Sequence, residues 1–304
     1  MIKTAFFTKR NIFLHPEFIR WARTNNIDST PILEPFAGSN NIINMLESIG
    51  LCSSFKAYDI ESKHKMVEIR DTIKDFPTGF KNIISNPPYL AKNSATKQGY
   101  KINTKYDDLY KDCLELCLNN ADNVALILPA SFITSSFNKE RLVAYIMLPY
   151  KDMFTDTDHP VCLALFEKNV ATSTKIYNGD IFLGYLEDML SVRDSILGNT
   201  SKEEVQFNIP ASKVGLYLLD GTNSRIRFVH GNEISDSNIK YSSRTITKIN
   251  IPERLNDIDA LNLRLNKYRE LTYDIFLTPF RGLRNDGLFR RKLSFGIARQ
   301  IILS

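Results

Sequence analysis

The sequence predicts an α/β fold: an open, mostly parallel sheet with helices on both faces, followed by a C-terminal α+β accessory domain. Apolar strand-like runs alternate with helical segments between residues 30 and 168, which is the pattern of parallel strands joined by crossover helices. The runs at 124–129 and 161–166 are continuously apolar, as in strands that are buried on both faces. Composition changes near 169–175, after which periodicity weakens.

The length of the chain fits two domains. Its 304 residues are 43% hydrophobic and 24% charged, values that are normal for a globular protein with a sizeable core. We expect one domain at residues 1–170 and a second at 171–304.

No apolar run reaches 18 residues, so we expect no transmembrane helix and no membrane partner. The first ten residues also lack the apolar stretch and cleavage site of a signal peptide. The expected location is the cytoplasm.

The elements are expected in the following order. In the first domain we predict a helix at 12–24, a strand at 31–34, a helix from Ile42, a strand at 55–60, a helix or its remnant at 63–70, a strand ending near Ser85, a polar mobile loop at 91–105, a helix at 106–119, a strand at 124–129, mixed loop and helix at 131–144, and a strand at 161–166. In the second we predict short strands at 176–177, 215–219 and 226–229, and a helix at 258–271.

Four residues at the end of one apolar run suggest chemistry. Ile83-Ile84 is followed at once by Asn86-Pro87-Pro88-Tyr89, and two prolines, which have no backbone donor, must end the strand there. Asn86 Oδ1 and the Pro87 carbonyl are then two acceptors close together, able to take both protons of a planar amino group. Such bonds localise the nitrogen lone pair, and Tyr89 could stack on the ring that carries it. The simpler interpretation is a strand-ending turn with a surface tyrosine.

Acidic residues follow earlier strands of the predicted sheet. Glu34 ends the first strand and precedes a turn with Gly38, where backbone can approach a ligand closely. Asp59 ends the second strand, 21 positions after that glycine, as in folds that grip ribose hydroxyls with a strand-end carboxylate. Asp71 or Asp75 could contact an adenine edge. A single glycine is not the dinucleotide-binding fingerprint.

Basic residues gather in two places. Residues 239–304 hold 13 Lys and Arg against 6 Asp and Glu, whereas 1–168 hold 20 against 19. This asymmetry suggests a polyanion-binding appendage on a neutral core, although a solvated basic surface is an equally simple interpretation. The candidates for phosphate contacts are Lys92, Lys97 and Lys101 in the polar loop and Arg281, Arg284, Arg290 and Arg291 in the tail. The tail could also be an ordinary surface hairpin.

Cysteines and histidines show no metal-binding pattern. The cysteines Cys52, Cys113, Cys117 and Cys162 form no CxxC pair, and the four histidines are scattered. We expect reduced cysteines, no disulfide and no metal.

These motifs together resemble the S-adenosylmethionine-dependent N6-adenine DNA methyltransferases, of the restriction-modification and phage types. Those enzymes carry a D/E-P-F-x-G motif, matched here by residues 34–38, and a D/N/S-P-P-Y/F/W motif, matched by residues 86–89. The resemblance covers roughly residues 5–168, and the motif order is that of the gamma type. A second glycine that often follows Gly38 in the family is replaced here by Ser39-Asn40.

The resemblance implies a Rossmann-like methyltransferase fold, S-adenosyl-L-methionine as cofactor and double-stranded DNA as partner, with a flipped adenine stacked on Tyr89. It implies direct methyl transfer to the adenine N6 held by Asn86 and Pro87, with Pro88 shaping the turn. The residues implied in cofactor binding are Thr8, Glu34, Phe36, Gly38, Asp59, Ile60 and Asp71. A cognate restriction endonuclease is a possible partner, and residues 171–304 are the expected target-recognition domain.

Three alternatives stay open. RNA adenine methyltransferases and protein glutamine methyltransferases share the Asn-Pro-Pro-Tyr turn, and a methyltransferase core can also serve as a non-catalytic nucleic-acid-binding protein. The glutamine enzymes carry their accessory domain before the cofactor motif, whereas the long extra segment of this chain follows the core. An Arg-rich C-terminal segment favours nucleic acid over a protein substrate.

Overall fold

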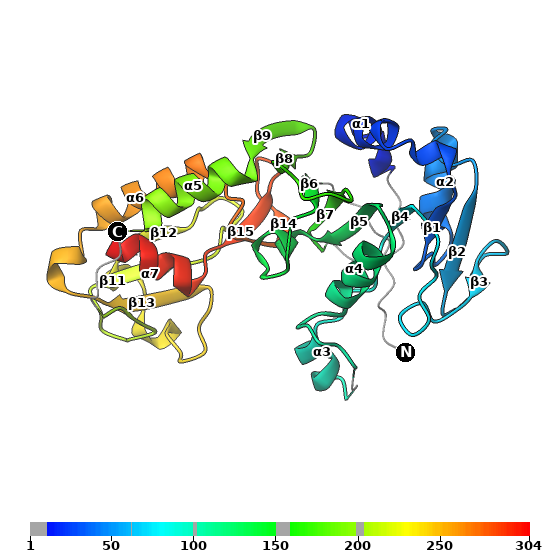
Figure 1. Ribbon diagram of the computed structural model, residues 1–304. Helices are drawn as coiled ribbons and strands as arrows, with labels where there is room; N and C mark the ends of the chain where they lie inside the picture. Colours follow the sequence, from blue (N-terminus) through cyan, green and yellow to red (C-terminus); the bar gives the residue numbers. More distant parts are fainter. Residues whose placement is uncertain (1–10, 62, 100–101, 150–158, 199–203) are drawn as a thin grey trace. The chain divides into compact units, whose positions relative to one another are not determined.

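The computed structural model describes residues 11–61, 63–99, 102–149, 159–198 and 204–304. The chain divides into two compact units, Met1–Leu183 and Gly184–Ser304 (Figure 1). The predicted Thr8 and Lys101 lie outside the described residues.

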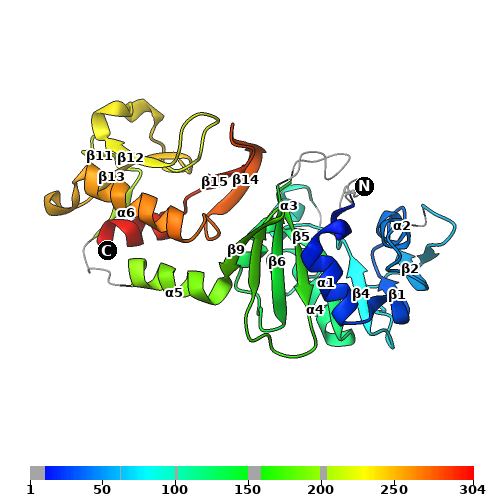
Figure 2. The same ribbon diagram turned by 90° about the horizontal axis from the view of Figure 1, so that it is seen from above.

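A nine-stranded sheet forms the first unit and continues to the boundary, with strand order β3-β2-β1-β4-β5-β7-β6-β8-β9 (Figure 2). Its strands are β1 (Ile32–Glu34), β2 (Phe55–Asp59), β3 (Glu68–Ile69), β4 (Asn82–Ser85), β5 (Asn123–Pro129), β6 (Leu142–Leu148), β7 (Val161–Phe166), β8 (Lys175–Asn178) and β9 (Ile181–Tyr185). The strands from β3 to β5 pair in parallel, and β7 runs antiparallel to both its neighbours. This mixed, mostly parallel sheet confirms the predicted Rossmann-like α/β fold.

The strand order determines where a ligand can bind. The chain moves from β1 to β2 on one side, and β4 then pairs on the other side of β1. Open parallel sheets bind ligands at such a reversal, beyond the carboxyl ends of the strands. The turn after β1 and the turn after β4 are therefore neighbours at this edge.

Helices and short 3-10 turns accompany the sheet. They are η1 (Ile12–Leu14), α1 (Pro16–Thr24), η2 (Ile27–Ser29), α2 (Asn41–Ser48), α3 (Lys92–Lys97), α4 (Leu109–Asn120) and η3 (Ala130–Thr134). Helix α1 begins with Pro16, which needs no donor there, and buries Phe18 and Trp21. The predicted helices at 12–24 and 106–119 are confirmed within a few residues.

Three predictions for this unit were wrong. The segment 63–70 is not helical, because its end, β3, pairs with Asp59 and Tyr58 of β2 as an exposed edge strand. The segment 131–144, predicted as mixed loop and helix, ends in the first residues of β6, a buried strand that pairs with both β7 and β8. The loop expected at 91–105 contains the short helix α3.

The boundary between the units also lies later than 170. Strand β8 pairs in parallel with β6, so the segment after 170 extends the sheet of the first unit. Hydrogen bonding to an existing edge thus outweighs the change in composition that suggested a junction at 169–175.

The second unit is α+β, as predicted. It contains a four-stranded antiparallel sheet of order β10-β13-β11-β12 and a separate hairpin, β14–β15. Its elements are α5 (Leu186–Leu197), β10 (Gln206–Phe207), β11 (Val214–Tyr217), β12 (Arg227–His230), η4 (Gly231–Glu233), η5 (Asp236–Asn238), β13 (Ile246–Asn250), η6 (Glu253–Leu255), α6 (Ile258–Leu271), β14 (Thr278–Leu283), β15 (Phe289–Lys292) and α7 (Phe295–Leu303). Across the parts of the chain described, no helix has the length and apolar character needed to cross a membrane.

Candidate active site at the carboxyl ends of β1, β2 and β4

The turn after β1 joins the end of β2 through backbone hydrogen bonds. The Gly38 N–H donates to Asp59 Oδ2 at 2.8 Å, and the Ala37 N–H donates to the Tyr58 carbonyl at 2.9 Å. Gly38 has a φ of 53° and Asn40 a φ of 62°. Glycine and asparagine are the residues that adopt this left-handed conformation most readily. Asn40 therefore supports the tight turn in a segment where relatives often have a second glycine.

Glu34, the last residue of β1, is buried at this edge with 1% of its surface exposed. Burial raises its pKa well above the ordinary value, against a hydrogen bond from the Ile43 backbone that lowers it, and the nearby Asp59 charge adds to the rise. Within the described residues, Glu34 Oε2 and the buried Asn40 Oδ1 have no hydrogen-bond partner. Unsatisfied buried oxygens are rare, and at a strand end they are suited to a polar ligand.

Asp59 and Ile60 present a polar and an apolar group side by side. Asp59 accepts hydrogen bonds from Gly38 and, at 3.1 Å, from the Glu61 N–H. Each carboxylate oxygen has a further lone pair, so a ligand hydroxyl can still bind. The Ile60 side chain is 66% exposed, and it could pack against a planar ring.

Asp71 lies in the turn after β3, and its link to the turn after β1 is indirect. Its carboxylate pairs with Lys74 at 2.7 Å, and this hydrogen bond lowers its pKa. The next residue, Thr72, is buried and donates to the Pro35 carbonyl at 2.8 Å, which ties this turn to the turn after β1. The structure thus brings Glu34, Gly38 and Asp59 together directly, and connects Asp71 to them through its neighbour. Phe36 lies within the same turn, half-buried.

The Asn86–Tyr89 turn follows β4 directly, next to β1. Tyr89 is not the surface residue of the simpler interpretation, because only 9% of it is exposed and burial raises its pKa well above the ordinary value. Its ring lies edge-on to Tyr110, with centroids 6.2 Å apart, and tilted against His159 at the same distance. Its hydroxyl is 2.6 Å from Asn86 Oδ1 and 2.7 Å from the Ile127 carbonyl oxygen.

Asp108 fixes the segment after this turn, a role that the sequence analysis missed. Its Oδ1 accepts hydrogen bonds from the Leu90 N–H at 2.9 Å and from the Tyr110 N–H at 3.4 Å, so one carboxylate caps α4 and anchors residue 90. The Leu109 N–H also donates to the Leu90 carbonyl. An aspartate immediately before a helical run is the sequence signal that could have identified the cap.

The predicted basic residues have different surroundings. Lys92 and Lys97 are exposed on α3, and Arg281 is exposed on β14. Arg290 is half-buried, and its Nε donates to the Asp220 carbonyl at 2.6 Å. All four side chains are thus at least partly exposed to solvent.

Arg284 and Arg291 have little exposed surface. The side chain of Arg284 is 8% exposed and pairs with Asp220 and Asp286, and Arg291 is 6% exposed. The segment is a hairpin held by a buried carboxylate, which agrees with the plainer of the two interpretations of the tail.

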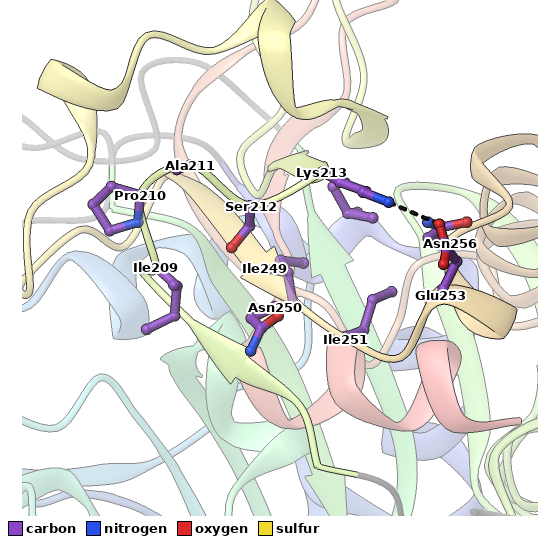
Figure 3. A pocket seen from close by; sticks show the side chains of 11 residues that line it. Ile209, Pro210, Ala211, Ser212, Lys213, Ile249, Asn250, Ile251, Glu253 and Asn256 are labelled. Carbon is purple, nitrogen blue, oxygen red and sulfur yellow. Dashed lines mark hydrogen bonds and ion pairs between the residues drawn. The ribbon is translucent and has the colours of Figure 1, made fainter.

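A cavity of about 350 Å³ lies in the second unit, beside the end of β13 (Figure 3). Its lining includes Ile209, Ala211, Lys213, Ile251 and Glu253. Lys213 and Glu253 form an ion pair of 2.7 Å at this site (Figure 3), so the lysine charge is already matched. None of the predicted site residues lines this cavity.

Within the described ranges, no group of three His, Cys, Asp or Glu side chains could hold a metal ion. The three cysteines at 113, 117 and 162 are buried, and burial raises the pKa of each thiol.

Solved structures of restriction-modification enzymes are similar to part of the chain. A type I restriction-modification methyltransferase subunit from Streptococcus thermophilus is 13% identical, covering 58% of this chain and 47% of that one, with a TM-score of 0.43. The type IIG restriction endonuclease BpuSI is 15% identical over 58% of this chain and 27% of its own, with a TM-score of 0.41. The Type ISP enzyme LlaGI, in complex with a DNA substrate mimic, is 12% identical over 60% and 24%, with a TM-score of 0.42. This chain thus covers less than half of each of these proteins.

No curated protein sequence matches the chain. A family model does match: that of the Eco57I restriction-modification methylases, over residues 5–151. This range contains both the Glu34–Gly38 turn and the Asn86–Tyr89 turn, and the match confirms the resemblance drawn from those motifs. Residues 5–151 of the chain are therefore similar to the Eco57I restriction-modification methylases.

Proposed function

We propose that this protein transfers a methyl group from S-adenosyl-L-methionine to N6 of an adenine flipped out of double-stranded DNA. The observation that carries the proposal is the position of the Asn86–Tyr89 turn. It follows β4, which pairs with β1, so its two acceptors lie at the same sheet edge as Glu34 and Gly38. Cofactor donor and amine acceptor would meet at this edge.

The residues at the edge fit the proposed cofactor. S-adenosyl-L-methionine supplies an electrophilic methyl group on a sulfonium when bound. The buried Glu34 and Asn40 oxygens can accept hydrogen bonds from its polar groups, and Asp59 can accept from its ribose hydroxyls. Ile60 offers an apolar surface to its adenine, and Gly38 lets the backbone approach closely. Phe36 and Asp71 complete the proposed set, with Thr8 outside the described residues.

Asn86 and Pro87 would prepare the amine for attack. Their oxygens accept the two N6 protons, which localises the lone pair on nitrogen and stabilises the positive charge that develops as the methyl group is transferred. In-line positioning then supplies most of the rate enhancement, and no covalent enzyme intermediate is needed. This route is consistent with buried cysteines whose thiol pKa values are raised.

DNA would be held mainly by its phosphates. The candidates for these phosphate contacts are the exposed Lys92, Lys97 and Arg281 and the half-buried Arg290. The second unit, Gly184–Ser304, would supply target recognition, and the resemblance makes a cognate restriction endonuclease a natural partner. Both would act in the cytoplasm of a bacterium or of a phage host.

The substitution Asn86→Ala tests the assignment of the site. It removes one of the two acceptors but touches no residue of the proposed cofactor set, so methyl transfer should fall about a hundred- to a thousandfold, as when a key transition-state hydrogen bond is lost. The dissociation constant of S-adenosyl-L-methionine, measured by calorimetry, should stay within about twofold. Equal loss of transfer and of cofactor binding would count against the assignment.

A further inference from the structure

The β14–β15 hairpin carries four arginines, and three of them are held by contacts within the second unit. The side chain of Arg284 is 8% exposed and pairs with Asp220 at 3.4 Å. Arg291 is buried, and Arg290 donates from Nε to the Asp220 carbonyl at 2.6 Å. Arg281 differs from these three: it is exposed, and within the described residues it has no hydrogen bond or ion pair.

A β-bulge turns the Arg281 side chain outward. The pairing of β14 with β15 is interrupted between Phe280 and Leu283. Arg281 and Gly282 therefore have no opposite residue on β15, and Gly282 adopts the left-handed conformation with a φ of 83°. Residues 280–282 are all exposed, whereas a regular strand that covers a core exposes alternate residues. Bulges re-aim side chains in this way.

The hairpin that presents Arg281 is anchored to the rest of the second unit by Asp220. Asp220 Oδ2 accepts a hydrogen bond from the Arg291 N–H at 3.2 Å, and the Asp220 N–H donates to the Arg291 carbonyl at 2.9 Å. The same carboxylate pairs with Arg269 of α6 at 3.0 Å. Arg281 thus projects from a fixed backbone, which reduces the entropy lost when its side chain binds a partner.

The exposed face of the hairpin combines cations with an apolar ring. Phe280 is 38% exposed, and the guanidinium of Arg290, the residue opposite it on β15, lies 5.7 Å from its ring centroid. Lys292 pairs with Thr278 on the same face and is half-buried. Cations of this kind neutralise phosphates, and an apolar side chain can contact a thymine methyl group.

We propose that Arg281 reads a guanine in the major groove of DNA, and that the β14–β15 hairpin is the two-stranded ribbon that enters the groove. The major groove admits such a ribbon, and an arginine fork binds O6 and N7 of guanine together. A guanidinium without a partner in the described protein has its donors available for this pair. The inference rests on the proposed function and gives Arg281 the role of a specificity-determining residue, which leaves the phosphates to Arg290 and Lys292.

Selection of binding sites from a library of random DNA duplexes tests this role without any methyl transfer. Wild-type protein should enrich a sequence with one fixed guanine, preferred about ten- to a hundredfold over other bases at that position. Arg281→Lys keeps the charge but loses the planar fork, so it should accept any base there while the other positions stay fixed. Its thermal unfolding should match that of the wild type, because Arg281 makes no contact that folding requires.

Lys292→Ala is the matched control on the same hairpin. It removes a charge assigned to phosphates, so it should weaken binding to all sequences alike and keep the fixed guanine. The slope of log K against log salt concentration should fall by about one in this variant. In Arg281→Ala, by contrast, the preference for guanine should be lost.

A guanine retained in Arg281→Lys, or a wild-type sequence without a fixed guanine, would overturn the inference. Uniform weakening of Arg281→Ala with an unchanged sequence would also overturn it, since that result marks a phosphate contact. Wild-type protein that selects a sequence with the predicted guanine but transfers no methyl group to it would contradict the proposed function and leave the role of Arg281 intact. Wild-type protein that binds no duplex would contradict both.

Discussion

Glu34 is a buried carboxyl group with an unsatisfied oxygen, at the point where a ligand is expected. Its surroundings raise the pKa of the carboxyl group, because burial opposes the charged form and Asp59 adds a second negative charge nearby. The unfolded chain releases this proton near the ordinary pKa of 4.5. Folding therefore retains a proton that the unfolded chain loses, and the folded protein is less stable wherever that difference exists.

The pH dependence of stability tests this description of Glu34. As pH rises above 4.5 toward the raised pKa of the folded protein, the free energy of unfolding should fall by up to about 1.4 kcal/mol per pH unit. Glu34→Gln has no proton to lose, so it should lack this component. Urea denaturation at a series of pH values compares the two proteins, and parallel curves would show that Glu34 is ionised in the folded state.

At the scale of elements, the catalytic turn depends on a helix cap. Asp108 begins α4 and anchors Leu90, one residue after Tyr89. The Asn86–Tyr89 turn is thus held by β4 before it and by the start of α4 after it. A fixed turn is what the proposed chemistry requires, since both acceptors must meet one amine.

Asp108→Ala should therefore reduce both stability and turnover. The free energy of unfolding should fall by about 1–2 kcal/mol, the usual cost of a lost cap, and kcat should fall because Leu90 loses its acceptor. Asp108→Asn keeps an oxygen at the cap and is the matched control, which should lose much less. Thermal unfolding and transfer assays measure the two effects, and an Asn variant as damaged as the Ala variant would show that the negative charge matters more than the cap.

Many of the helices and strands could be predicted from the sequence. The helix at 258–271 matches α6 because its apolar residues and its Asp257 cap both mark it. Strand β6 was missed although residues 142–148 form a continuous apolar run of the kind that identified the strands at 124–129 and 161–166. Strand β3 has only two residues, too few for a periodicity to be recognised.

The grouping of the candidate site residues could be predicted from the order of the strands. Strand ends meet at one edge of a parallel sheet, so residues far apart in sequence, such as Glu34, Asp59 and Asn86, could be placed together from the order of the elements. Burial could not be predicted in this way. The sequence does not show that Asp220 lies in the second unit as a buried acceptor, which is why Arg284 and Arg291 were placed among the phosphate contacts.

At the scale of the whole molecule, the second unit contains a buried group of ion pairs around one carboxylate. In the second unit, Asp220 has no exposed surface and pairs with Arg269 at 3.0 Å and with Arg284 at 3.4 Å. Both arginine side chains are less than one-tenth exposed. Removing one partner of a buried ion pair is costly, because the other charge stays buried without compensation.

Asp220→Ala should accordingly destabilise the second unit by about 3–5 kcal/mol. In differential scanning calorimetry, the transition of this unit should move to lower temperature while that of the first unit stays in place. Asp286→Ala removes a partly exposed partner of Arg284 and should have a small effect. A joint shift of all transitions in the Asp220 variant would show that the two units unfold as one.

The most direct test of the proposed function is methyl transfer from labelled S-adenosyl-L-methionine to unmethylated duplex DNA, with total RNA and a protein extract as parallel substrates. We expect label in DNA, recovered as N6-methyladenine, and its loss in the Asn86→Ala variant. Label confined to RNA or protein would keep the chemistry of the Asn86–Tyr89 turn but contradict the DNA substrate. No label in any substrate, from protein that binds the cofactor, would contradict the proposed activity of the chain on its own.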